Sequence, residues 1–242
     1  MYKITILTDT SSWMNKYNIN LKNKLEKLGH KVKLIHSKKE LENGDIAFFL
    51  SCFEIISGEF LSLNKNNIVV HASKLPNGKG WSPASWQILE GKNIIPLTLF
   101  EASEKVDAGD IYLQDKLVLD GCELIDEWQD KLGKKIVQMC ITYVSKYKKM
   151  KGESQRGEET FYKKRTPKDS ELDINKTIKE QFNLLRIVDN EKYPAFFKFK
   201  NKIYTLKIES VKLQERERER EREKTLARMA SLFSLELRLL NV

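Results

Sequence analysis

The chain has 242 residues, of which 40% are hydrophobic and 10% aromatic, and this composition excludes a disordered or fibrous protein. Its formal net charge of +9 is compatible with a nucleic-acid surface or with a small anionic ligand, and the scarcity of arginine and aromatic clusters favours the ligand. The 3 cysteines and 3 histidines show no metal-ligand spacing, so we expect no metal site.

The first predicted element is a strand over residues 3–8, because "KITILT" alternates and is rich in β-branched residues. This start is not a signal segment, and no apolar run approaches the roughly 20 residues that span a bilayer. We therefore expect a cytoplasmic protein without a membrane partner. A helix should follow the strand, with Leu21, Leu25 and Leu28 on one face and Gly29 at the position of a left-handed C-terminal cap.

Three further strands are predicted over residues 32–35, 45–51 and 67–73. The second and third are short, continuously apolar runs, which are typical of strands buried on both faces of a parallel sheet. Strands that alternate with helices predict an open α/β sheet, in which ligands bind beyond the carboxyl ends of the strands. The loops selected by this rule are residues 9–13, residues 51–53 and the loop that begins at His71.

Downstream, residues 85–89 predict a short helix, and "LTLFEA" and "IYLQDKLVL" predict two more strands. A long amphipathic helix follows, because apolar residues recur every three or four positions from Leu124 to Val144. We expect a first domain over residues 1–150. Residues 151–160 lack periodicity and resemble a linker, whereas residues 161–212 contain a helix over about 176–188 and two strand-like stretches, which predict a small α/β appendage.

The tail, residues 213–242, differs in composition from the rest of the chain. Its "ERERERERE" run fits a solvated helix, yet a GA dinucleotide repeat read in triplets also encodes Glu and Arg by turns. Before this run the only arginines are Arg156, Arg165 and Arg186, whereas after its start arginine is frequent and lysine almost vanishes. We therefore hypothesise that slippage in a repeat shifted the reading frame of this tail.

The residues with the clearest chemical potential follow the predicted strand at 67–73. His71 begins "HASKLPNGKGWSP", where a histidine is either catalytic or satisfies a local hydrogen bond. "DAGDIY" places Asp107 before another strand, so a carboxylate can reach the same edge. Histidine with a carboxylate can accept a proton from an amine nucleophile and stabilise the resulting charge. An ordinary turn aspartate is the alternative for Asp107.

These stretches carry a family resemblance. "HASKLPNGKGWSPASWQILEGKN" followed by "PLTLFEASEKVDAGDIYLQ" resembles the signature of the N10-formyltetrahydrofolate-dependent formyltransferases, and "FYKKRTPKDSELD" with "FNLLRIVDNEKYPAFF" extends the resemblance to about residue 210. The pattern is most similar to the sugar N-formyltransferases that act on UDP-4-amino-4,6-dideoxy-N-acetyl-altrosamine in the pseudaminic acid branch. The matching positions are His71, Ser73, Leu75, Pro76, Gly80, Pro83, Trp86, Asp107, Gly109 and Ile111.

The resemblance implies a fold and a role for each loop. The implied fold is α/β, with a Rossmann-like parallel sheet of the formyltransferase type and a small C-terminal α/β appendage. His71 matches the catalytic histidine, and Asp107 matches the carboxylate that pairs with it and lies near the folate. The other implied folate-binding residues are Ser51, Cys52 and Phe53. The implied substrate-binding residues are Asp9, Ser11, Ser12, Trp13, Lys74, Lys79 and Gly80.

Some of these positions have a structural alternative. Lys79 fits a solvated loop lysine as well as a ligand for a phosphate or the folate glutamate. Trp13 fits a core position as well as a stacking partner for a uracil ring. Both interpretations stay open at this point.

The chain departs from the family pattern beside the histidine. The family usually has Asn-x-His, in which the amide helps to hold the formyl oxygen, but Val69 stands at that position. Asn67 faces the same side of a regular strand and lies roughly 7 Å further back. We expect Asn67 to reach in through a bulge as a catalytic residue, unless protonated His71 or a backbone N–H replaces it. The gap matters because losing one oxyanion donor costs about 100- to 1,000-fold in rate.

The resemblance therefore implies an enzyme that transfers a formyl group from N10-formyltetrahydrofolate, as co-substrate and without a metal, to the amine of a nucleotide-linked sugar. We expect no nucleic-acid partner, because the residues after the linker are few for an OB-type tRNA-binding domain. The purine-pathway formyltransferase is disfavoured because "DTSSW" lacks a glycine-rich phosphate loop. A non-catalytic binding protein for folate or nucleotide sugar is the alternative of another class. Apolar strands such as "AFFKFK" suggest a homodimer.

Overall fold

The computed structural model describes residues 1–211 and residue 226 of the chain. The chain divides into two units, Met1–Leu206 and Lys207–Val242. All strands and helices discussed below belong to the first unit. The expected Glu/Arg tail and its proposed frame shift lie outside the described residues, apart from residue 226. Among the described residues, no helix combines the length and the apolar character needed to cross a membrane.

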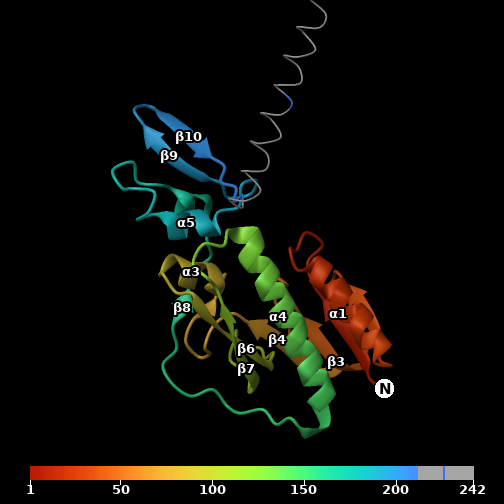
Figure 1. Cartoon of the computed structure of the whole chain (residues 1–242). Coiled ribbons are helices and arrows are strands. Elements are labelled where there is room, and N and C mark those ends of the chain that lie inside the picture. The colour runs from red at the N-terminus through yellow and green to blue at the C-terminus, as the bar shows by residue number, and fades with distance from the viewer. Residues whose placement is uncertain (212–225, 227–242) are drawn as a thin grey trace, which may run out of the picture. The chain divides into compact units, whose positions relative to one another are not determined.

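The main sheet has 6 strands in the order β2-β1-β3-β4-β6-β7 (Figure 1). The pairs β1 with β2, β1 with β3, and β3 with β4 are parallel. β4 with β6 and β6 with β7 are antiparallel, so the sheet is mixed where we expected it to be parallel. A plain loop joins β6 to β7, which is sufficient for antiparallel but not for parallel neighbours. The strands are β1 (Lys3–Leu7), β2 (Lys31–Ile35), β3 (Gly44–Phe49), β4 (Asn64–His71), β6 (Ile94–Glu101) and β7 (Ile111–Val118).

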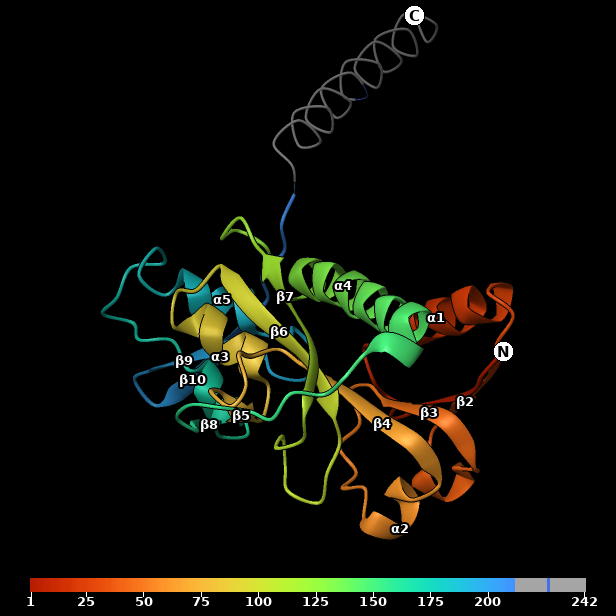
Figure 2. The same cartoon turned by 90° about the horizontal axis from the view of Figure 1, so that it is seen from below.

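Both faces of this sheet are covered. Helices α1 (Asn15–Lys27) and α4 (Ile125–Lys146) lie side by side on one face, and the short α2 (Gly58–Leu61) lies on the other (Figure 2). Side chains alternate between the faces along each strand. Ile46 and Phe48 belong to the core under α1 and α4, whereas Ala47 and Phe49 belong to the cluster beside α2. The predicted α/β class is therefore confirmed, with a core on each side of the sheet.

The two predicted long helices are present. α1 buries Leu21 and Leu25 against the sheet, whereas Leu28 follows the helix and is 58% exposed. Gly29 has a φ of +84° and ends the helix as predicted, because glycine adopts this left-handed conformation without a steric cost. α4 buries residues at helical spacing along its whole length, as the periodicity indicates.

The remaining elements are short. They are η1 (Lys38–Glu40), β5 (Lys79–Gly80), α3 (Pro83–Leu89), η2 (Tyr147–Lys149), β8 (Phe161–Tyr162), η3 (Pro167–Ser170), α5 (Phe182–Ile187), β9 (Ala195–Phe199) and β10 (Lys202–Leu206). The helix predicted over 176–188 shortens to α5. Residues before it form turns, in which the Gln181 side chain accepts from the N–H of Asp173 at 2.6 Å and donates to the carbonyl of Asp173 at 2.9 Å.

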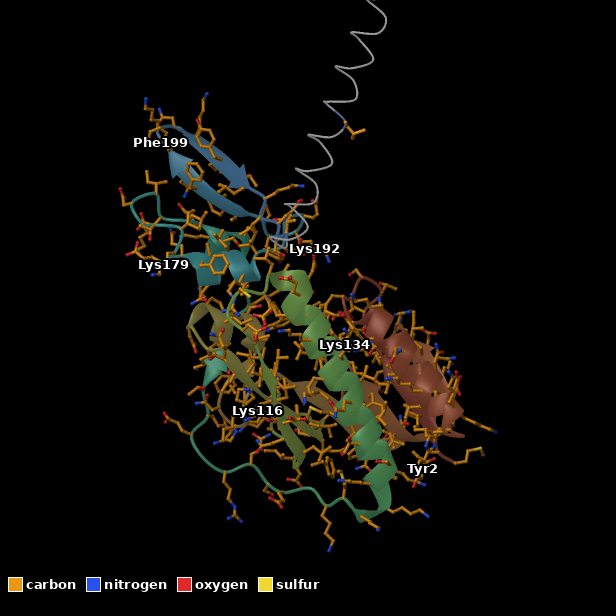
Figure 3. All side chains as sticks on the ribbon, viewed as in Figure 1. Tyr2, Lys116, Lys134, Lys179, Lys192 and Phe199 are labelled. Atoms are coloured by element: carbon orange, nitrogen blue, oxygen red, sulfur yellow. The ribbon has the colours of Figure 1, made fainter. Side chains whose placement is uncertain are left out.

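β9 and β10 form a two-stranded antiparallel sheet. Phe197 and Tyr204 stack across it with ring centroids 5.2 Å apart. Figure 3 shows Phe199 at the outer end of this hairpin, far from Lys134 on α4. The expected homodimer rests on the apolar side chains of this hairpin and stays a prediction.

A buried arginine fastens α5 to the main domain. The Arg186 guanidinium donates to the Asn93 side chain at 2.9 Å and lies 3.5 Å from the carboxylate of Glu123. The Trp128 indole donates to the Arg186 carbonyl at 2.9 Å. Because Arg186 is 1% exposed, the counter-charge of Glu123 and the acceptor oxygen of Asn93 take the place of water around its guanidinium.

Candidate functional site

Three loops meet at the carboxyl ends of the parallel strands. Asp9 follows β1, Phe53 follows β3 and His71 ends β4, so strand direction alone places all three at one edge of the sheet. The Phe53 N–H donates to Oδ2 of Asp9 at 3.1 Å. The Phe53 ring stacks on Trp81, from the loop after His71, with centroids 5.5 Å apart. The structure thus brings together the loops that the sequence selected.

His71 is held at the centre of this edge. The residue is 8% exposed, and its Nε2 lies 2.9 Å from the carbonyl oxygen of Gly78. Because a carbonyl only accepts hydrogen bonds, Nε2 carries the proton in the neutral ring, and the other ring nitrogen keeps its lone pair. Gly78 has a φ of +76°, and a Cβ there would lie 2.9 Å from the Cβ of Ser73, so glycine allows this turn to approach the imidazole.

Asp107 lies in the loop between β6 and β7 and faces His71. Its Oδ2 is 3.8 Å from Nε2 of His71, and the same oxygen accepts a hydrogen bond from the Gly80 N–H at 2.9 Å. The two side chains are only 10% and 14% exposed. At 3.8 Å the carboxylate acts on the imidazole through its charge, because the contact is too long for a hydrogen bond.

The backbone at Asp107 is strained. Its φ of +51° lies in the left-handed region, which costs a residue with a Cβ roughly 1 to 2 kcal/mol. Such a conformation persists only when neighbouring groups hold it. The imidazole of His71 has an unprotonated nitrogen and can act as a general base. The carboxylate of Asp107 beside it can act as its charge partner.

Asn67 does not join this pair. Its amide nitrogen donates to the carbonyl of Leu61 at 2.8 Å, and the residue is 4% exposed. β4 pairs with β3 in regular register from Asn66 to Val69, so there is no bulge there. Asn67 therefore lies about 13 Å from His71 along the strand. The expected bulge is absent, whereas a role of Asn67 at the formyl oxygen stays a prediction.

Lys79 is also placed differently from our expectation. It is 1% exposed, and its ammonium forms an ion pair with Glu159 at 2.7 Å. A buried, paired ammonium is not a solvated loop lysine, whereas the expected contact of Lys79 with a phosphate or the folate glutamate stays a prediction. Gly80 does reach the site, where its N–H holds Asp107. Lys74 is exposed in the loop that follows His71.

The residues expected to bind the folate lie in the loop after β3. Ser51 has a φ of +53°, and Phe53 is 65% exposed. Cys52 is half-buried, and burial raises the pKa of its thiol to about 11, so it is protonated and a poor nucleophile at neutral pH. Of these residues, Phe53 offers the largest open surface.

The β1 loop divides between the rim and the core. The Ser12 hydroxyl accepts from the Met14 N–H at 3.2 Å, while Ser11 is exposed. Trp13 packs against the core and meets Tyr17 edge to face with centroids 6.0 Å apart. Trp13 is thus partly buried against the core, and its expected contact with a uracil ring stays a prediction, as do the expected substrate contacts of Asp9 and Ser11.

Residues of the expected linker contribute to the site. The Gln155 amide donates to the carbonyls of Asp107 and Gly109, at 3.0 and 2.8 Å. Thr160 accepts from the Gly78 N–H through its hydroxyl at 2.8 Å. Composition gave no signal for these residues, because polar, aperiodic stretches are typical of linkers.

The site retains polar atoms that suit a polar ligand. The hydroxyl of Ser73 and Oε1 of Gln155 are buried without a hydrogen-bond partner in the described part of the chain. Buried polar atoms are normally paired, so a ligand with donors would satisfy them. Among residues 1–211 and 226, no group of three or more His, Cys, Asp or Glu side chains is arranged to hold a metal ion.

Comparisons with known proteins identify the family of the chain. Residues 5–144 match the family model described as formyl transferase. The methionyl-tRNA formyltransferase of Lactococcus lactis is 27% identical over 165 residues, which are 66% of this chain and 52% of that protein. The chain therefore spans about half the length of this curated relative.

Solved structures share the fold. The methionyl-tRNA formyltransferase from Clostridium thermocellum superposes with a TM-score of 0.75 at 25% identity, over 88% of this chain and 94% of that one. A sugar N-formyltransferase from Shewanella superposes with a TM-score of 0.62 at 15% identity, over 88% of this chain and 100% of that one. The second likeness is one of fold alone.

Proposed function

Because the chain belongs to the formyl transferase family, we propose that it transfers a formyl group from N10-formyltetrahydrofolate to the free amine of a nucleotide-linked sugar. The observation that carries formyl transfer is the buried pair of His71 and Asp107, at 3.8 Å, at the edge where the sheet gathers its loops. More specifically, the acceptor that we propose is a UDP-linked 4-amino-4,6-dideoxy sugar of the pseudaminic acid branch. Its support is the resemblance carried by "KGWSP" and "LTLFEA".

The residues of this chain manage the proton of the attacking amine. The unprotonated ring nitrogen of His71 accepts that proton, and the Gly78 carbonyl keeps the ring oriented through Nε2. The negative charge of Asp107 stabilises the imidazolium that forms. General base assistance of this kind accelerates a reaction by about 100- to 10,000-fold.

The folate supplies the formyl group, and the loop residues fit such a ligand. Phe53 offers an exposed aromatic ring, while the partly exposed side chain of Ser51 in the same loop offers a polar contact. The β3 loop and the Asp107 loop flank the same edge of the sheet. A pterin has both a flat ring and several polar groups, so these contacts match its two kinds of surface.

The exposed indole of Trp81 favours an acceptor with a nucleobase. Trp81 is 37% exposed and stacks on Phe53, and the Lys164 ammonium lies 4.8 Å from the centre of the Trp81 ring. A planar base can stack on such a surface, and a nearby cation suits a diphosphate.

Methionyl-tRNA is the second candidate acceptor. The relative from Lactococcus lactis, a methionyl-tRNA formyltransferase, favours it. A binding protein without turnover is a third candidate, because Val69 replaces the amide that the family pattern places before the histidine.

One assay separates the three candidates. The full chain is incubated with N10-formyltetrahydrofolate and either a panel of nucleotide-linked amino sugars or methionyl-tRNA, and both tetrahydrofolate release and the mass of the acceptor are measured. We expect an added formyl group on an amino sugar and none on the tRNA. Formylation of the tRNA alone would replace our acceptor with the second candidate.

Two histidine variants provide the matched comparison. His71→Asn removes the base, and we expect it to slow turnover by about 100-fold or more. His36→Asn changes an exposed histidine whose ring nitrogen contacts the Thr8 carbonyl at 3.1 Å, and we expect it to keep wild-type turnover. Ligand binding without turnover, unaffected by His71→Asn, would support the binding protein instead.

A further inference from the structure

The stretch that the sequence marks as a linker makes contacts on both sides of the His71 and Asp107 pair. We propose that residues 152–162, which we call the strap, position the catalytic pair, with Gln155 acting on Asp107 and Glu159 acting on the loop after His71. This inference rests on the function proposed above for His71 and Asp107. Within the strap, Gln155, Glu159 and Thr160 are the positioning residues, because they contact the loops rather than the reacting atoms.

Gln155 holds the loop that carries Asp107. Its amide nitrogen donates to the carbonyl of Asp107 at 3.0 Å and to the carbonyl of Gly109 at 2.8 Å. A side-chain amide has two hydrogens, so one group can clamp the backbone on both sides of Ala108. These two hydrogen bonds hold the backbone at Asp107, whose strained φ of +51° needs support from neighbouring groups.

The same loop is pressed against the sheet at Gly109. A Cβ at this position would collide with the carbonyl oxygen of Glu101, the last residue of β6. The loop can therefore approach the sheet only with glycine there. Gln155 closes the loop from the outside, so Asp107 is held between the strap and the sheet.

Other strap residues hold the loop on the His71 side. The Thr160 hydroxyl accepts from the Gly78 N–H at 2.8 Å, and the Thr160 carbonyl accepts from the Lys79 N–H at 2.8 Å. Glu159 pairs with the buried Lys79 ammonium at 2.7 Å. Gly78 is the residue whose carbonyl orients His71, so these bonds fix the acceptor that sets the imidazole.

Both ends of the strap are anchored to regular structure. Glu153 and Ile111, at the start of β7, exchange backbone hydrogen bonds of 2.8 and 2.9 Å. At the other end, β8 pairs in parallel with β5, which contains Gly80. A segment fixed at both ends and bonded to both loops couples the position of Asp107 to that of His71.

A segment that only stabilised the fold would make a different prediction. Its loss would lower the folded population without changing the turnover of the molecules that stay folded. A positioning segment instead lowers kcat while the KM for the acceptor stays constant, and its effect disappears once the group that it positions has been removed. Separate measurement of kcat and KM, together with the double variant, therefore distinguishes a positioning role from a purely stabilising one.

The first arm of the test uses Gln155→Met, which keeps the length of the side chain and removes both donors. Losing two hydrogen bonds that hold Asp107 should lower kcat by about 10- to 100-fold. The KM for the amino sugar should stay within about twofold of the wild type. Arg156→Met is the matched control, because Arg156 is the exposed neighbour, and it should leave kcat unchanged.

The double variant shows whether Gln155 acts through Asp107. In the Asp107→Asn background, adding Gln155→Met should change kcat by less than about twofold, because the positioned charge is already gone. A multiplicative loss in the double variant would assign Gln155 a role independent of Asp107 and overturn the proposal.

The second arm uses adjacent glutamates. Glu159→Gln removes the charge that pairs with Lys79, whereas Glu158→Gln removes a charge from its exposed neighbour. Glu159→Gln should lower kcat by about threefold to tenfold, because the carboxylate is partly exposed and its pairing is screened. Equal effects of the two variants would remove Glu159 from the proposal.

A measurement without substrate keeps this inference separate from the proposed function. Hydrogen exchange of the full chain is followed for peptides that cover residues 102–110. In Gln155→Met the amides of this loop should exchange about tenfold faster than in the wild type or in Arg156→Met. Unchanged exchange overturns the strap even if the enzyme is active. Faster exchange in a chain that formylates no acceptor supports the strap and rejects the proposed function.

Discussion

Oδ2 of Asp107 lies 3.8 Å from Nε2 of His71, and a hydrogen bond of 2.9 Å from Gly80 holds it there. The two residues come from different connections of the sheet, His71 from the end of β4 and Asp107 from the turn between the antiparallel strands β6 and β7. Because both side chains are nearly buried, the charge of Asp107 is only weakly screened by water. The main consequence of this arrangement is that the protonated form of His71 has a fixed counter-charge in Asp107.

Asp107→Asn should separate charge from shape. The amide oxygen can still accept from Gly80, while the negative charge that stabilises the imidazolium is lost. We expect kcat to fall by about 100-fold or more with the melting temperature nearly unchanged. The control is Glu104→Gln, which removes an exposed carboxylate from the same loop. If both variants retain wild-type kcat, Asp107 is an ordinary turn residue.

Asn67→Ala should affect stability rather than turnover. The substitution leaves the Leu61 carbonyl without the donor that now lies 2.8 Å away. An unpaired buried group of this kind costs about 1 to 3 kcal/mol, which thermal or urea unfolding can measure. We expect kcat to be preserved at temperatures where the variant is folded. A large loss of kcat at unchanged stability would restore Asn67 as a donor to the formyl oxygen.

Stability should depend on pH through Glu123. Burial alone raises its pKa, but hydrogen bonds from Lys131 and from the backbone N–H groups of Asp120, Glu123 and Gly121 outweigh this effect and lower the pKa from 4.5 to about 2. A lowered pKa means that the stabilisation is fully present above pH 4.5 and is lost as the pH falls toward 2.

The test of this linkage compares the wild type with Glu123→Gln by urea unfolding. At pH 6 the variant should be less stable by about 1 to 3 kcal/mol, and the difference should shrink when both are measured at pH 3. Asp126→Asn, at an exposed position of α4, is the control and should show a small difference at both values. A difference that is independent of pH would mean that the carboxylate charge of Glu123 contributes nothing.

Trp81→Ala should weaken binding of the nucleotide sugar. Loss of one stacking contact with a base is worth about 1 to 3 kcal/mol, so the KM for the sugar should rise by roughly tenfold with kcat nearly constant. Phe199→Ala is the matched control, since it removes another exposed aromatic side chain, at the outer end of the β9–β10 hairpin. A KM that changes for the folate and not for the sugar would place the pterin at Trp81.

Gly80→Ala should disturb the catalytic pair through the backbone. Gly80 has a φ of +93°, and an added Cβ would lie 2.5 Å from the Tyr162 carbonyl oxygen. Relief requires β5 to move away from β8, which also moves the N–H that holds Asp107. We expect a loss of kcat together with a lower melting temperature. Wild-type values of both would show that the loop tolerates this displacement.

The sequence by itself determined the elements and the edge at which the site forms. Burial of consecutive apolar residues in β3 and of every third or fourth residue in α4 is a local pattern, and such a pattern can be recognised in the sequence. The carboxyl ends of parallel strands meet at one edge, so Asp9, Phe53 and His71 could be grouped without coordinates. The pairing of His71 with Asp107 followed from the resemblance rather than from spacing.

Only the tertiary structure decided which polar groups meet. The ammonium of Lys79 pairs with Glu159, which lies 80 residues away in the chain, and the amide of Asn67 donates to the carbonyl of Leu61. The direction of β6 and the clamp of Gln155 on the Asp107 loop likewise depend on contacts between distant segments. Hydrogen bonds and ion pairs act over a few ångströms and leave no periodic trace in the sequence, so composition alone made the strap look like a linker.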